Sequence, residues 1–270
     1  MSTNAPSGPG PGASGSYLDG LFSLRGRVAV VTGGSSGIGR AIAEALARAG
    51  ASVVVLARRE TELDATVADL TALGCRAARV SADLADRDAL AAAADRAAEP
   101  FGEPDILVNA AGINLRPPMG DLTPQVWDTT MAVNLDAPHL LSQRYAPGMA
   151  ERGYGRLIHL TSQQAYRAFV SSGAYGVSKA GLAALARSQA EAWSPHGVTA
   201  NTLVPGFVLT PLNQRLQDDP DLVQALAART FTGRNGIAED FAGAAVFLAS
   251  AASGYVTGQA LFVDGGFSTH

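Results

Sequence analysis

Several residue types are scarce in this sequence of 270 residues, and each shortage excludes a class of protein. The single cysteine, Cys75, can form neither an internal disulfide nor a multi-cysteine site, so we expect it to be structural and expect no metal. No apolar run reaches the roughly 18 residues that span a bilayer. The 20 basic residues are scattered among 24 acidic ones, which leaves no basic surface for a phosphate backbone. The sequence therefore predicts no membrane association and no nucleic-acid partner.

The N-terminal segment differs in composition from the rest of the chain. Residues 1–17 consist mainly of Gly, Pro, Ser and Ala and have little to bury, which predicts a disordered tail. The segment lacks the charged start and apolar centre of a signal peptide, so we expect a cytoplasmic protein. Residues 18–270 are expected to form one domain, because a chain of this length buries about three quarters of its extended surface.

From residue 27 onward, short β-branched runs alternate with longer Ala-rich and Leu-rich stretches, the pattern of βαβ units. Strands are expected at 27–33, 52–57, 76–83, 105–110, 155–162, 198–206 and 260–266, and main helices at 37–49, 60–73, 86–99, 124–151, 173–193 and 238–250. This order predicts an α/β fold, a doubly wound seven-stranded parallel sheet of the Rossmann type. Residues 209–236 interrupt the alternation and are expected to form a small lid insertion.

The first predicted strand runs into "TGGSSGIG" and then directly into a helix. Glycine permits a tight turn and close backbone approach, and a helix start presents free N–H groups to a phosphate. The pattern favours a dinucleotide-binding turn over an ordinary glycine turn, although its spacing differs from Gly-x-Gly-x-x-Gly. The residues expected to contact the cofactor here are Gly33, Ser35, Ser36, Gly37, Ile38 and Gly39.

The end of the second predicted strand indicates which dinucleotide is bound. An acidic residue at that point would contact the ribose hydroxyls of NAD, but the sequence has Ala57 there, followed by Arg58 and Arg59. Two guanidinium groups can bind a 2′-phosphate. The alternative is that both arginines only begin a solvated helix. We expect NADP as the cofactor, with NAD possible.

Lysine occurs once, at position 179 in "SSGAYGVSKAGLAAL", and the other 19 basic side chains are arginine. Composition alone does not decide between a chance lysine on a solvated helix face and a position that requires lysine.

Further short motifs occur along the chain: Asp83-Leu84, "NAAG" at 109–112, Asn134 in "AVNL", Ser162 in "LIHLTS", "YGVSK" at 175–179, Pro205-Gly206 and "LFVDGG". Together with the glycine turn they resemble the short-chain dehydrogenase/reductase family over about residues 21–266. The segments "LFSLRGRVAVVTG" and "AGINLRPP" resemble the gluconate 5-dehydrogenase-like subgroup of sugar-acid oxidoreductases.

The resemblance implies a role for each matching residue. Tyr175 would be the catalytic acid/base, Lys179 its electrostatic partner and Ser162 the group that holds the substrate oxygen. Asn134 would organise the backbone and serve a proton relay through water. Further cofactor contacts are implied for Asp83, Leu84, Asn109, Ala110, Gly112, Tyr175, Lys179, Pro205, Gly206, Val208 and Thr210.

The tyrosine and the lysine are four residues apart on a predicted helix and therefore share one face. A phenol pKa near 10 is high for a group that must also act as a base, and we expect the Lys179 ammonium to lower the Tyr175 pKa by roughly 1 to 3 units. A planar guanidinium is wider and is no simple replacement for that ammonium. Strand spacing does not distinguish Ser162 from Thr161; the family resemblance selects Ser162.

Substrate contacts are expected from residues that leave the fourth and fifth predicted strands. Arg116 would pair with a substrate carboxylate, or is instead a solvated loop charge, and Gln163, Gln164 and Tyr166 would bind hydroxyl groups. His159 is expected to be an ordinary strand side chain.

These observations predict an NADP-preferring oxidoreductase that interconverts a secondary alcohol and a ketone, with a sugar acid or polyol as substrate. Two alternatives stay open: a 3-oxoacyl thioester or general ketone reductase with a more apolar pocket, and a non-catalytic dinucleotide sensor that would have lost one of the catalytic side chains. The resemblance also implies a homo-oligomer, a dimer or homotetramer, formed through the long helices.

Overall fold

The computed structural model describes residues 16–269, without the side chains of residues 215 and 216. The tail expected over 1–17 lies outside the described residues, except for its last two positions. Ser16 caps a short helix, α1 (Tyr17–Phe22), and Tyr17 is its first residue. Ser16 Oγ accepts a hydrogen bond from the Asp19 N–H, and the Asp19 carboxylate accepts one from the Ser16 N–H. This reciprocal cap stabilises the first helical turn, while the prediction of a disordered tail for the residues before Ser16 stays a prediction.

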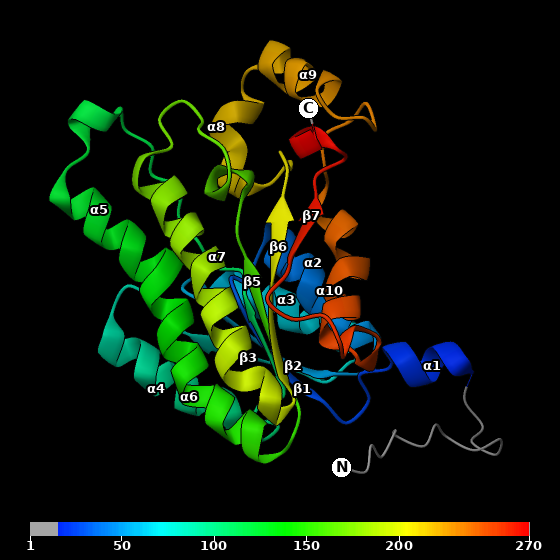
Figure 1. The fold of residues 1–270 in the computed structure, drawn as a ribbon. Coiled ribbons are helices and arrows are strands. Elements are labelled where there is room, and N and C mark those ends of the chain that lie inside the picture. The colour runs from blue at the N-terminus through cyan, green and yellow to red at the C-terminus, as the bar shows by residue number, and fades with distance from the viewer. Residues whose placement is uncertain (1–15, 270) are drawn as a thin grey trace, which may run out of the picture.

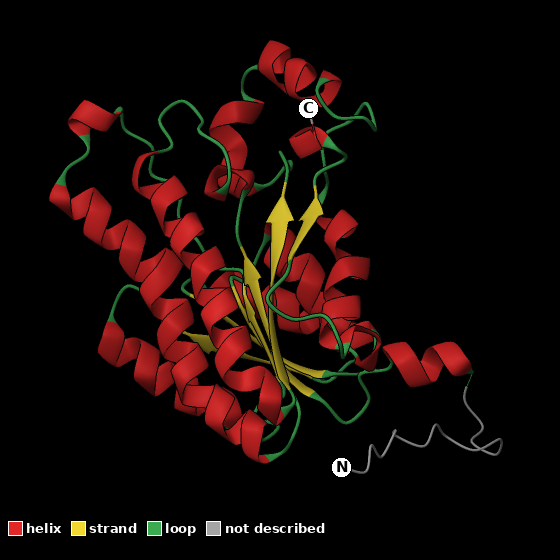
Figure 2. Ribbon diagram, viewed as in Figure 1, coloured by secondary structure: helices red, strands yellow, loops and turns green. Residues whose placement is uncertain are grey.

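A seven-stranded parallel sheet forms the centre of the molecule, in the order β3-β2-β1-β4-β5-β6-β7 (Figures 1 and 2). Its strands are β1 (Val28–Thr32), β2 (Ser52–Ala57), β3 (Ala77–Ser81), β4 (Ile106–Asn109), β5 (Gly155–Leu160), β6 (Val198–Pro205) and β7 (Ala260–Val263). The central strands are buried on both faces, which is why they read as continuous β-branched runs in the sequence. The predicted fold class and all seven predicted strands are confirmed.

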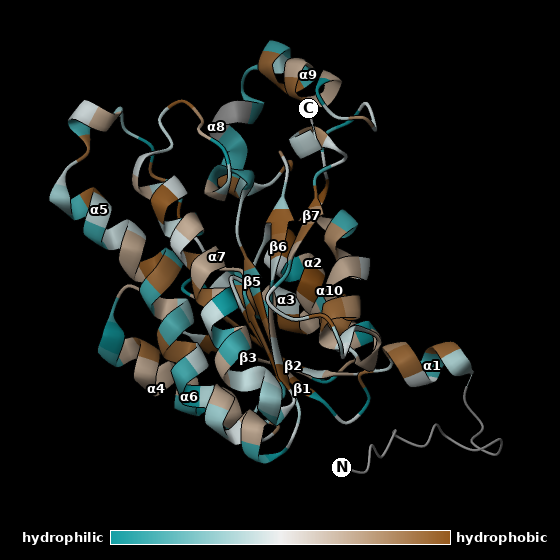
Figure 3. Cartoon of the chain, in the orientation of Figure 1, coloured by the Kyte–Doolittle hydropathy of each residue, from teal (hydrophilic) through white to brown (hydrophobic). Residues whose placement is uncertain are grey.

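Helices cover both faces of the sheet (Figure 1). One layer contains α2 (Gly37–Arg48), α3 (Glu60–Ala72) and α10 (Ala242–Ala249), and the other contains α4 (Arg87–Ala98), α6 (Ala137–Glu151) and α7 (Gly173–Trp193). Ile42 and Leu248 are buried in the first layer, and Leu141 and Tyr145 in the second. The apolar colouring of the strands in Figure 3 follows these two cores. Short 3-10 helices cover Met119–Asp121, Gln163–Ala165, Ser194–His196, Pro211–Asn213, Ala238–Phe241, Ala251–Ser253 and Phe267–Thr269.

The helix predicted over 124–151 is divided. It begins as α5 (Pro124–Met131), capped by the Thr123 hydroxyl, widens into a π-helix over Ala132–Asp136, and continues as α6. A π-helical turn takes one extra residue and commonly occurs at functional sites. Here it contains Asn134, so the prediction of a continuous α-helix was wrong at the residue that bears on the site.

The strand order creates a crevice at the carboxyl ends of the sheet. The chain runs outward from β1 to β3 and then returns to the other side of β1 to form β4. Loops that leave β1 and β4 therefore diverge, and ligands of such sheets bind where they separate. The segment expected as a lid contains α8 (Gln214–Gln217) and α9 (Pro220–Ala228), which lie beyond the carboxyl ends of β6 and β7 (Figure 1).

Candidate active site

A groove of about 520 Å³ opens at the crevice between the β1 and β4 loops. Its lining includes thirteen of the residues predicted to bind the cofactor: Gly33, Ser35, Ser36, Gly37, Ile38, Gly39, Arg58, Arg59, Asp83, Leu84, Ala110, Gly112 and Thr210. These residues come from the segments that follow five different strands, β1, β2, β3, β4 and β6. The fold thus places motifs that are far apart in the sequence along one groove.

The glycine turn after β1 is shaped for close approach. Gly33 has a φ of 68°, and a Cβ at this position would lie 2.8 Å from the Ala111 nitrogen. A Cβ on Gly39 would lie 2.4 Å from the Gly33 carbonyl oxygen. Helix α2 starts directly after Ser36, whose side chain does not cap it, so its first N–H groups face the groove with the positive end of the helix dipole. These features suit a pyrophosphate.

The other end of the groove is basic. Ala57 ends β2 without a carboxylate, and the exposed Arg58 and Arg59 follow it. Arg59 pairs with Glu62 at 2.8 Å and donates to Ser36 Oγ at 3.4 Å. The residues of this groove therefore fit a nicotinamide dinucleotide, with the glycine turn at the pyrophosphate and the two arginines at the adenosine end.

The remaining predicted cofactor residues lie elsewhere. Pro205, Gly206 and Val208 line an adjoining cavity, together with Tyr175 and Lys179. Asn109 lines neither space, and its contact with the cofactor stays a prediction. It lies 1% exposed in β4, where its Nδ2 contacts His159 Nδ1 at 3.1 Å. Its amide nitrogen therefore bonds to the neighbouring strand β5 inside the sheet.

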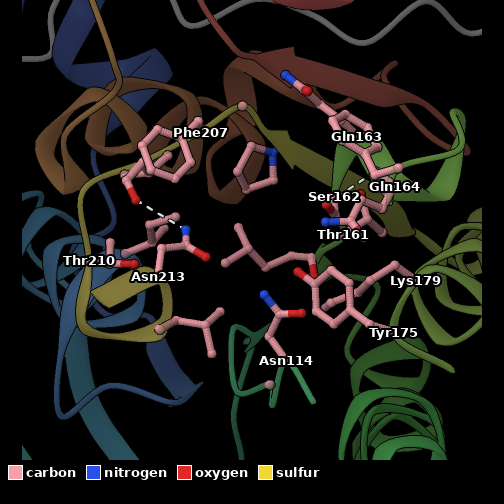
Figure 4. A pocket seen from close by; sticks show the side chains of 18 of the residues that line it. Asn114, Thr161, Ser162, Gln163, Gln164, Tyr175, Lys179, Phe207, Thr210 and Asn213 are labelled. Carbon is pink, nitrogen blue, oxygen red and sulfur yellow. Dashed lines mark hydrogen bonds between the residues drawn. The ribbon is translucent and has the colours of Figure 1, made fainter. Parts of the chain in front are cut away.

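The adjoining cavity, of about 140 Å³, shares Gly112, Asn114, Leu160 and Thr210 with the groove. Ser162 enters it from the end of β5, and Tyr175 and Lys179 enter it from the first turns of α7 (Figure 4). A molecule in this cavity would therefore touch both the serine and the tyrosine beside the end of the groove.

Lys179 is buried beside the ring of Tyr175. It is 3% exposed, its Nζ donates a hydrogen bond of 2.7 Å to the Leu160 carbonyl, and the same nitrogen lies 5.8 Å from the Tyr175 ring centroid. Burial lowers the pKa of the Lys179 ammonium to about 8. A Cβ on Gly112 would lie 3.4 Å from Nζ, so the ammonium occupies a narrow space.

The Tyr175 pKa differs from our prediction. Burial raises the pKa of its hydroxyl, while a hydrogen bond with Ser162 and the positive charge of Arg116 act in the opposite direction. Without a ligand, loss of hydration outweighs these two effects. The expected lowering was therefore wrong for the ligand-free chain, where the lysine Nζ is bonded to the Leu160 carbonyl.

Thr161 and Ser162, at the end of β5, differ in their hydrogen-bond partners. Thr161 donates its hydroxyl to the Leu203 carbonyl at 3.1 Å. Ser162 Oγ accepts a hydrogen bond from the Gln164 N–H, and the Ser162 hydroxyl acts to lower the pKa of Tyr175 in the same cavity. The geometry agrees with the choice of Ser162.

Asn134 is fully buried and lines neither space. Its Oδ1 accepts a hydrogen bond of 2.9 Å from the Ile113 N–H, and its Nδ2 donates to the Ile113 carbonyl at 3.0 Å and to Ser178 Oγ at 3.1 Å. The π-helical turn thus fixes the loop after β4 to helix α7. This arrangement agrees with the expected backbone-organising role.

His159 is part of a buried polar triad. Its Nδ1 faces Asn109 Nδ2, and its Nε2 lies 2.7 Å from Gln189 Oε1 on α7. Because Gln189 Oε1 only accepts, the imidazole Nε2 carries the proton and donates it. Burial lowers the His159 pKa to about 4, opposed by the bond to Gln189. His159 is a strand residue, as expected, and it ties β4, β5 and α7 together.

Three of the four predicted substrate residues line the catalytic cavity: Arg116, Gln163 and Gln164. Arg116 donates to the carbonyls of Val170 and Ser171. Gln163 Nε2 donates to Asp264 at 3.4 Å, and Gln164 Oε1 accepts from Ser172 Oγ at 2.7 Å.

Tyr166 does not line the cavity, and its contact with a substrate stays a prediction. It is 44% exposed, and its ring packs against Phe262 of β7 with centroids 5.2 Å apart. The turn over Gln163–Ala165 directs it outward. Sequence reasoning missed several cavity residues: Asn114, Phe169, Phe207, Asn213, Leu226 and Phe267. Only Asn114, two residues from Gly112 and from Arg116, had a signal in the sequence.

No helix within residues 16–269 is long and apolar enough to cross a membrane. Over the same described range, no three His, Cys, Asp or Glu side chains are grouped so that they could hold a metal ion.

Comparison with known proteins bears on this site directly. A family model described as enoyl-(acyl carrier protein) reductase matches residues 33–268. Gluconate 5-dehydrogenase of Gluconobacter oxydans (strain 621H) is 38% identical over 248 residues, 92% of this chain and 97% of that protein. D-threitol dehydrogenase of Mycolicibacterium smegmatis (strain ATCC 700084 / mc(2)155) is 39% identical over 247 residues, 92% of this chain and 95% of that protein.

A solved structure is similar over nearly its whole length. The gluconate 5-dehydrogenase from Burkholderia cenocepacia J2315, in complex with NADP and tartrate, has a TM-score of 0.89 and 37% identity, and the match covers 94% of this chain and 100% of that chain. The likeness therefore includes the catalytic half of the fold as well as the dinucleotide groove. On this evidence the chain belongs to the short-chain dehydrogenase/reductase family and is an NAD(P)-dependent oxidoreductase that acts on CH–OH groups.

Proposed function

We propose that this protein is an NADP-preferring oxidoreductase that interconverts a secondary alcohol and a ketone, with a sugar acid or polyol as substrate. One observation carries the substrate proposal: Arg116 lines the cavity near enough to Tyr175 for its charge to act on the Tyr175 pKa. A substrate carboxylate at Arg116 would therefore leave a carbon of the same molecule beside the tyrosine. The names of the relatives, which act on gluconate and threitol, support a polyhydroxylated substrate.

In this proposal, Ser162 and Tyr175 hold the substrate oxygen, and Tyr175 gives up or takes the proton. When bound, the nicotinamide dinucleotide supplies or accepts the hydride. Lys179 provides a positive charge beside Tyr175, and this charge favours the ionised form of the Tyr175 hydroxyl during alcohol oxidation. Asn134 holds the loop after β4 in place and, with Lys179, serves a proton relay through water.

The preference for NADP rests on the basic end of the groove. Ala57 offers no carboxylate to a ribose hydroxyl, and Arg58 is the residue that we propose for the 2′-phosphate. The NADP bound to the Burkholderia cenocepacia enzyme supports this choice. Replacing Arg58 with Ala should lower the kcat/KM ratio of NADP over NAD by at least about tenfold. An unchanged ratio would exclude Arg58.

The decisive test is a substrate panel with NADPH and NADH, run on the wild type and on Tyr175→Phe. Turnover of keto sugar acids or ketoses by the wild type, reduced by about 1,000-fold or more in the variant, is expected from loss of the acid/base. Undiminished turnover in the variant would overturn the proposed mechanism. A non-catalytic dinucleotide sensor would turn over no substrate while still binding NADPH.

Recognition of the carboxylate is tested separately with Arg116→Ala. We expect its KM to rise for acidic substrates and to change little for neutral ketones. Arg187→Ala, on α7 and outside the cavity lining, is the control. Equal changes for acidic and neutral ketones would remove the carboxylate from the proposal, because Arg116 also holds the carbonyls of Val170 and Ser171.

A second candidate, reduction of a 3-oxoacyl thioester, is favoured by the apolar side of the cavity. Its lining includes the apolar residues Phe169, Phe207, Leu226 and Phe267. A 3-oxoacyl thioester in the same panel distinguishes the two, since an enzyme for sugar acids should have the higher kcat/KM for the acids.

We propose that residues 209–236 act as the lid of this domain, because Thr210, Leu212, Asn213 and Leu226 contribute to the cavity wall. We also propose a homotetramer formed through the long helices. Trp127 of α5 and Val177 of α7 expose apolar side chains on helices that pack together. Light scattering after size exclusion tests the oligomeric state. A cytoplasmic location stays a prediction, to be tested by cell fractionation.

A further inference from the structure

The amide oxygen of Asn114 is buried at the catalytic cavity without a hydrogen-bond partner. Among residues 16–269, four other buried side-chain atoms lack partners, on Asn109, Thr199, Asn235 and Ser268, and none of these residues lines either the cavity or the groove. Asn114 lines both spaces. A buried polar group without a partner is costly and calls for an explanation at the place where it occurs.

The loop that presents Asn114 is fixed on both sides. Immediately before it, the N–H and the carbonyl of Ile113 are both bonded to the Asn134 amide, at 2.9 and 3.0 Å. Two residues after it, Arg116 is bonded to the carbonyls of Val170 and Ser171. Reorientation of the loop cannot give Asn114 a protein partner without breaking these contacts. A molecule bound in one of the two spaces that Asn114 lines can supply the missing donor.

The position of the side chain indicates which part of that molecule donates. In Figure 4 the Asn114 amide rises into the cavity beside Tyr175, across from Asn213. Ser162 and Tyr175 line the same cavity, and in the proposed function they hold the reacting oxygen. The Asn114 oxygen, a hydrogen-bond acceptor next to these two residues, would contact the group attached to the carbon beside the reacting carbonyl. A hydroxyl there would donate to the Asn114 oxygen, whereas a methylene would leave that oxygen unpaired.

We propose that Asn114 is a specificity residue that accepts a hydrogen bond from a hydroxyl on the carbon next to the reacting carbonyl. It selects α-hydroxy ketones, and the corresponding vicinal diols, over ketones without the hydroxyl. A site built to bond a substrate hydroxyl discriminates strongly against the analogue that lacks it, because its own buried group is left unsatisfied. The inference deepens the proposed function and rests on it for the polyhydroxylated substrate.

The test uses two ketones that differ in one hydroxyl, acetoin and 2-butanone, with NADPH as the reductant. The measured quantity is the ratio of their kcat/KM values. The wild type should prefer acetoin, and Asn114→Leu, similar in shape but without an acceptor, should lower that ratio by about tenfold or more. Asn114→Asp keeps the acceptor and should keep the preference for acetoin.

Asn213→Leu is the matched control. It removes an amide from the same cavity, but the Asn213 Nδ2 is already bonded to the Val208 carbonyl. We expect its acetoin ratio to stay within about twofold of the wild type. NADPH affinity, measured by fluorescence, shows whether each variant keeps its cofactor site. If Asn114→Leu does not fold or does not bind NADPH, Asn114→Ala is measured in its place.

Equal losses for both ketones, or an Asn114→Leu variant with weakened NADPH binding and an unchanged ratio, would overturn the inference and assign Asn114 to packing or to the cofactor. The two probe ketones carry no carboxylate. A wild type that fails with sugar acids but prefers acetoin through Asn114 would refute the proposed substrate and leave this inference standing.

Discussion

The only lysine of the chain is buried in the wall of the catalytic cavity, beside Tyr175. Lys179 is 3% exposed, its Nζ is bonded to the Leu160 carbonyl, and the Gly112 backbone closes the space beside it. An ammonium is compact and has three donors that can turn, whereas a guanidinium is planar and wider. Burial explains what composition left open: this position needs a short, buried cation, while most arginines of the chain lie at the surface.

Lys179→Arg is therefore expected to lose much more activity than stability. The larger head group must displace the Leu160 contact or the loop at Gly112. We expect kcat to fall by about 1,000-fold, equivalent to about 4 kcal/mol, and the free energy of unfolding to fall by about 1 to 3 kcal/mol. Steady-state kinetics and urea unfolding measure the two effects. Matching losses in both quantities would make the lysine a packing residue.

The buried His159 predicts how stability depends on pH. Its pKa falls from an ordinary 6.5 to about 4, so between these values the unfolded chain binds more protons than the folded one. The stability associated with a neutral His159 is complete above pH 6.5 and is lost as the pH falls toward 4. Lys179 faces the same imidazole and opposes its protonation, and Asn109 and Gln189 are its uncharged neighbours.

Urea unfolding of the wild type and of His159→Asn at pH 7.5 and pH 4.5 isolates this effect. The advantage of the wild type should shrink at the lower pH, by up to about 3 kcal/mol. Parallel stability curves for the two proteins would show that His159 does not titrate in this range.

At the scale of elements, the turn from β1 to α2 has almost no tolerance for a side chain. A Cβ on Gly39 would meet the Gly33 carbonyl oxygen at 2.4 Å, so Gly39→Ala must shift the backbone that faces the pyrophosphate. We expect NADPH to bind at least about tenfold more weakly, as measured by fluorescence titration.

Gly243→Ala provides the comparison for that glycine. It lies in α10 with no atom within 4 Å of an added Cβ, and its replacement should leave NADPH binding unchanged while adding about 0.5 to 1 kcal/mol of stability. If Gly39→Ala bound NADPH as tightly as Gly243→Ala does, the turn would not be the pyrophosphate site.

The sequence predicted the strands well because parallel strands buried on both faces must be apolar along their whole length. It failed where geometry depends on one inserted residue or on a distant partner. The π-helical turn at Asn134 has no compositional signal, since the residues around it suit an ordinary helix. Helix α1 did have a signal, the reciprocal cap of Ser16 and Asp19, which the composition of the tail obscured.

The same distinction between local sequence and distant partners applies to the predicted residues of the site. Those whose role depends on the local backbone, such as Gly33 and Ser162, were predicted from their motifs. The surroundings of others come from distant elements and were not predicted: Asn109 bonds to β5, and Tyr166 packs on β7. The Tyr175 pKa also depends on burial by the assembled fold, which residue spacing does not report.

At the scale of the whole molecule, the residues proposed for catalysis lie at the carboxyl ends of the strands, and a cluster of stabilising contacts lies at the opposite, amino ends. Tyr154, just before β5, is placed between two guanidinium groups, with Arg27 at 3.5 Å and Arg156 at 4.2 Å from its ring centroid. Its hydroxyl donates to the Ala249 carbonyl at 2.8 Å. Asp105 pairs with Arg27 at 3.7 Å. These contacts join β1, β4, β5 and α10 far from Ser162.

Tyr154→Leu should therefore destabilise the protein without slowing it. Loss of the ring between two cations and of the hydroxyl bond should cost about 2 to 4 kcal/mol in the free energy of unfolding. We expect kcat at 25 °C to stay within about twofold of the wild type. Tyr255→Leu, at a fully exposed tyrosine, is the control and should change neither quantity. A large fall in kcat for Tyr154→Leu would show that the two ends of the sheet are coupled.

The position of β4 beside β1 also determines the order in which the protein can assemble. Strands β1, β2 and β3 pair with sequence neighbours and can come together as soon as they leave the ribosome. The bond from the Val28 N–H to the Asp105 carboxylate spans 77 residues, so the second half of the sheet joins through a long loop closure. The dinucleotide groove exists only after that closure. NADP therefore stabilises the finished fold by mass action and has no site on the half-made chain.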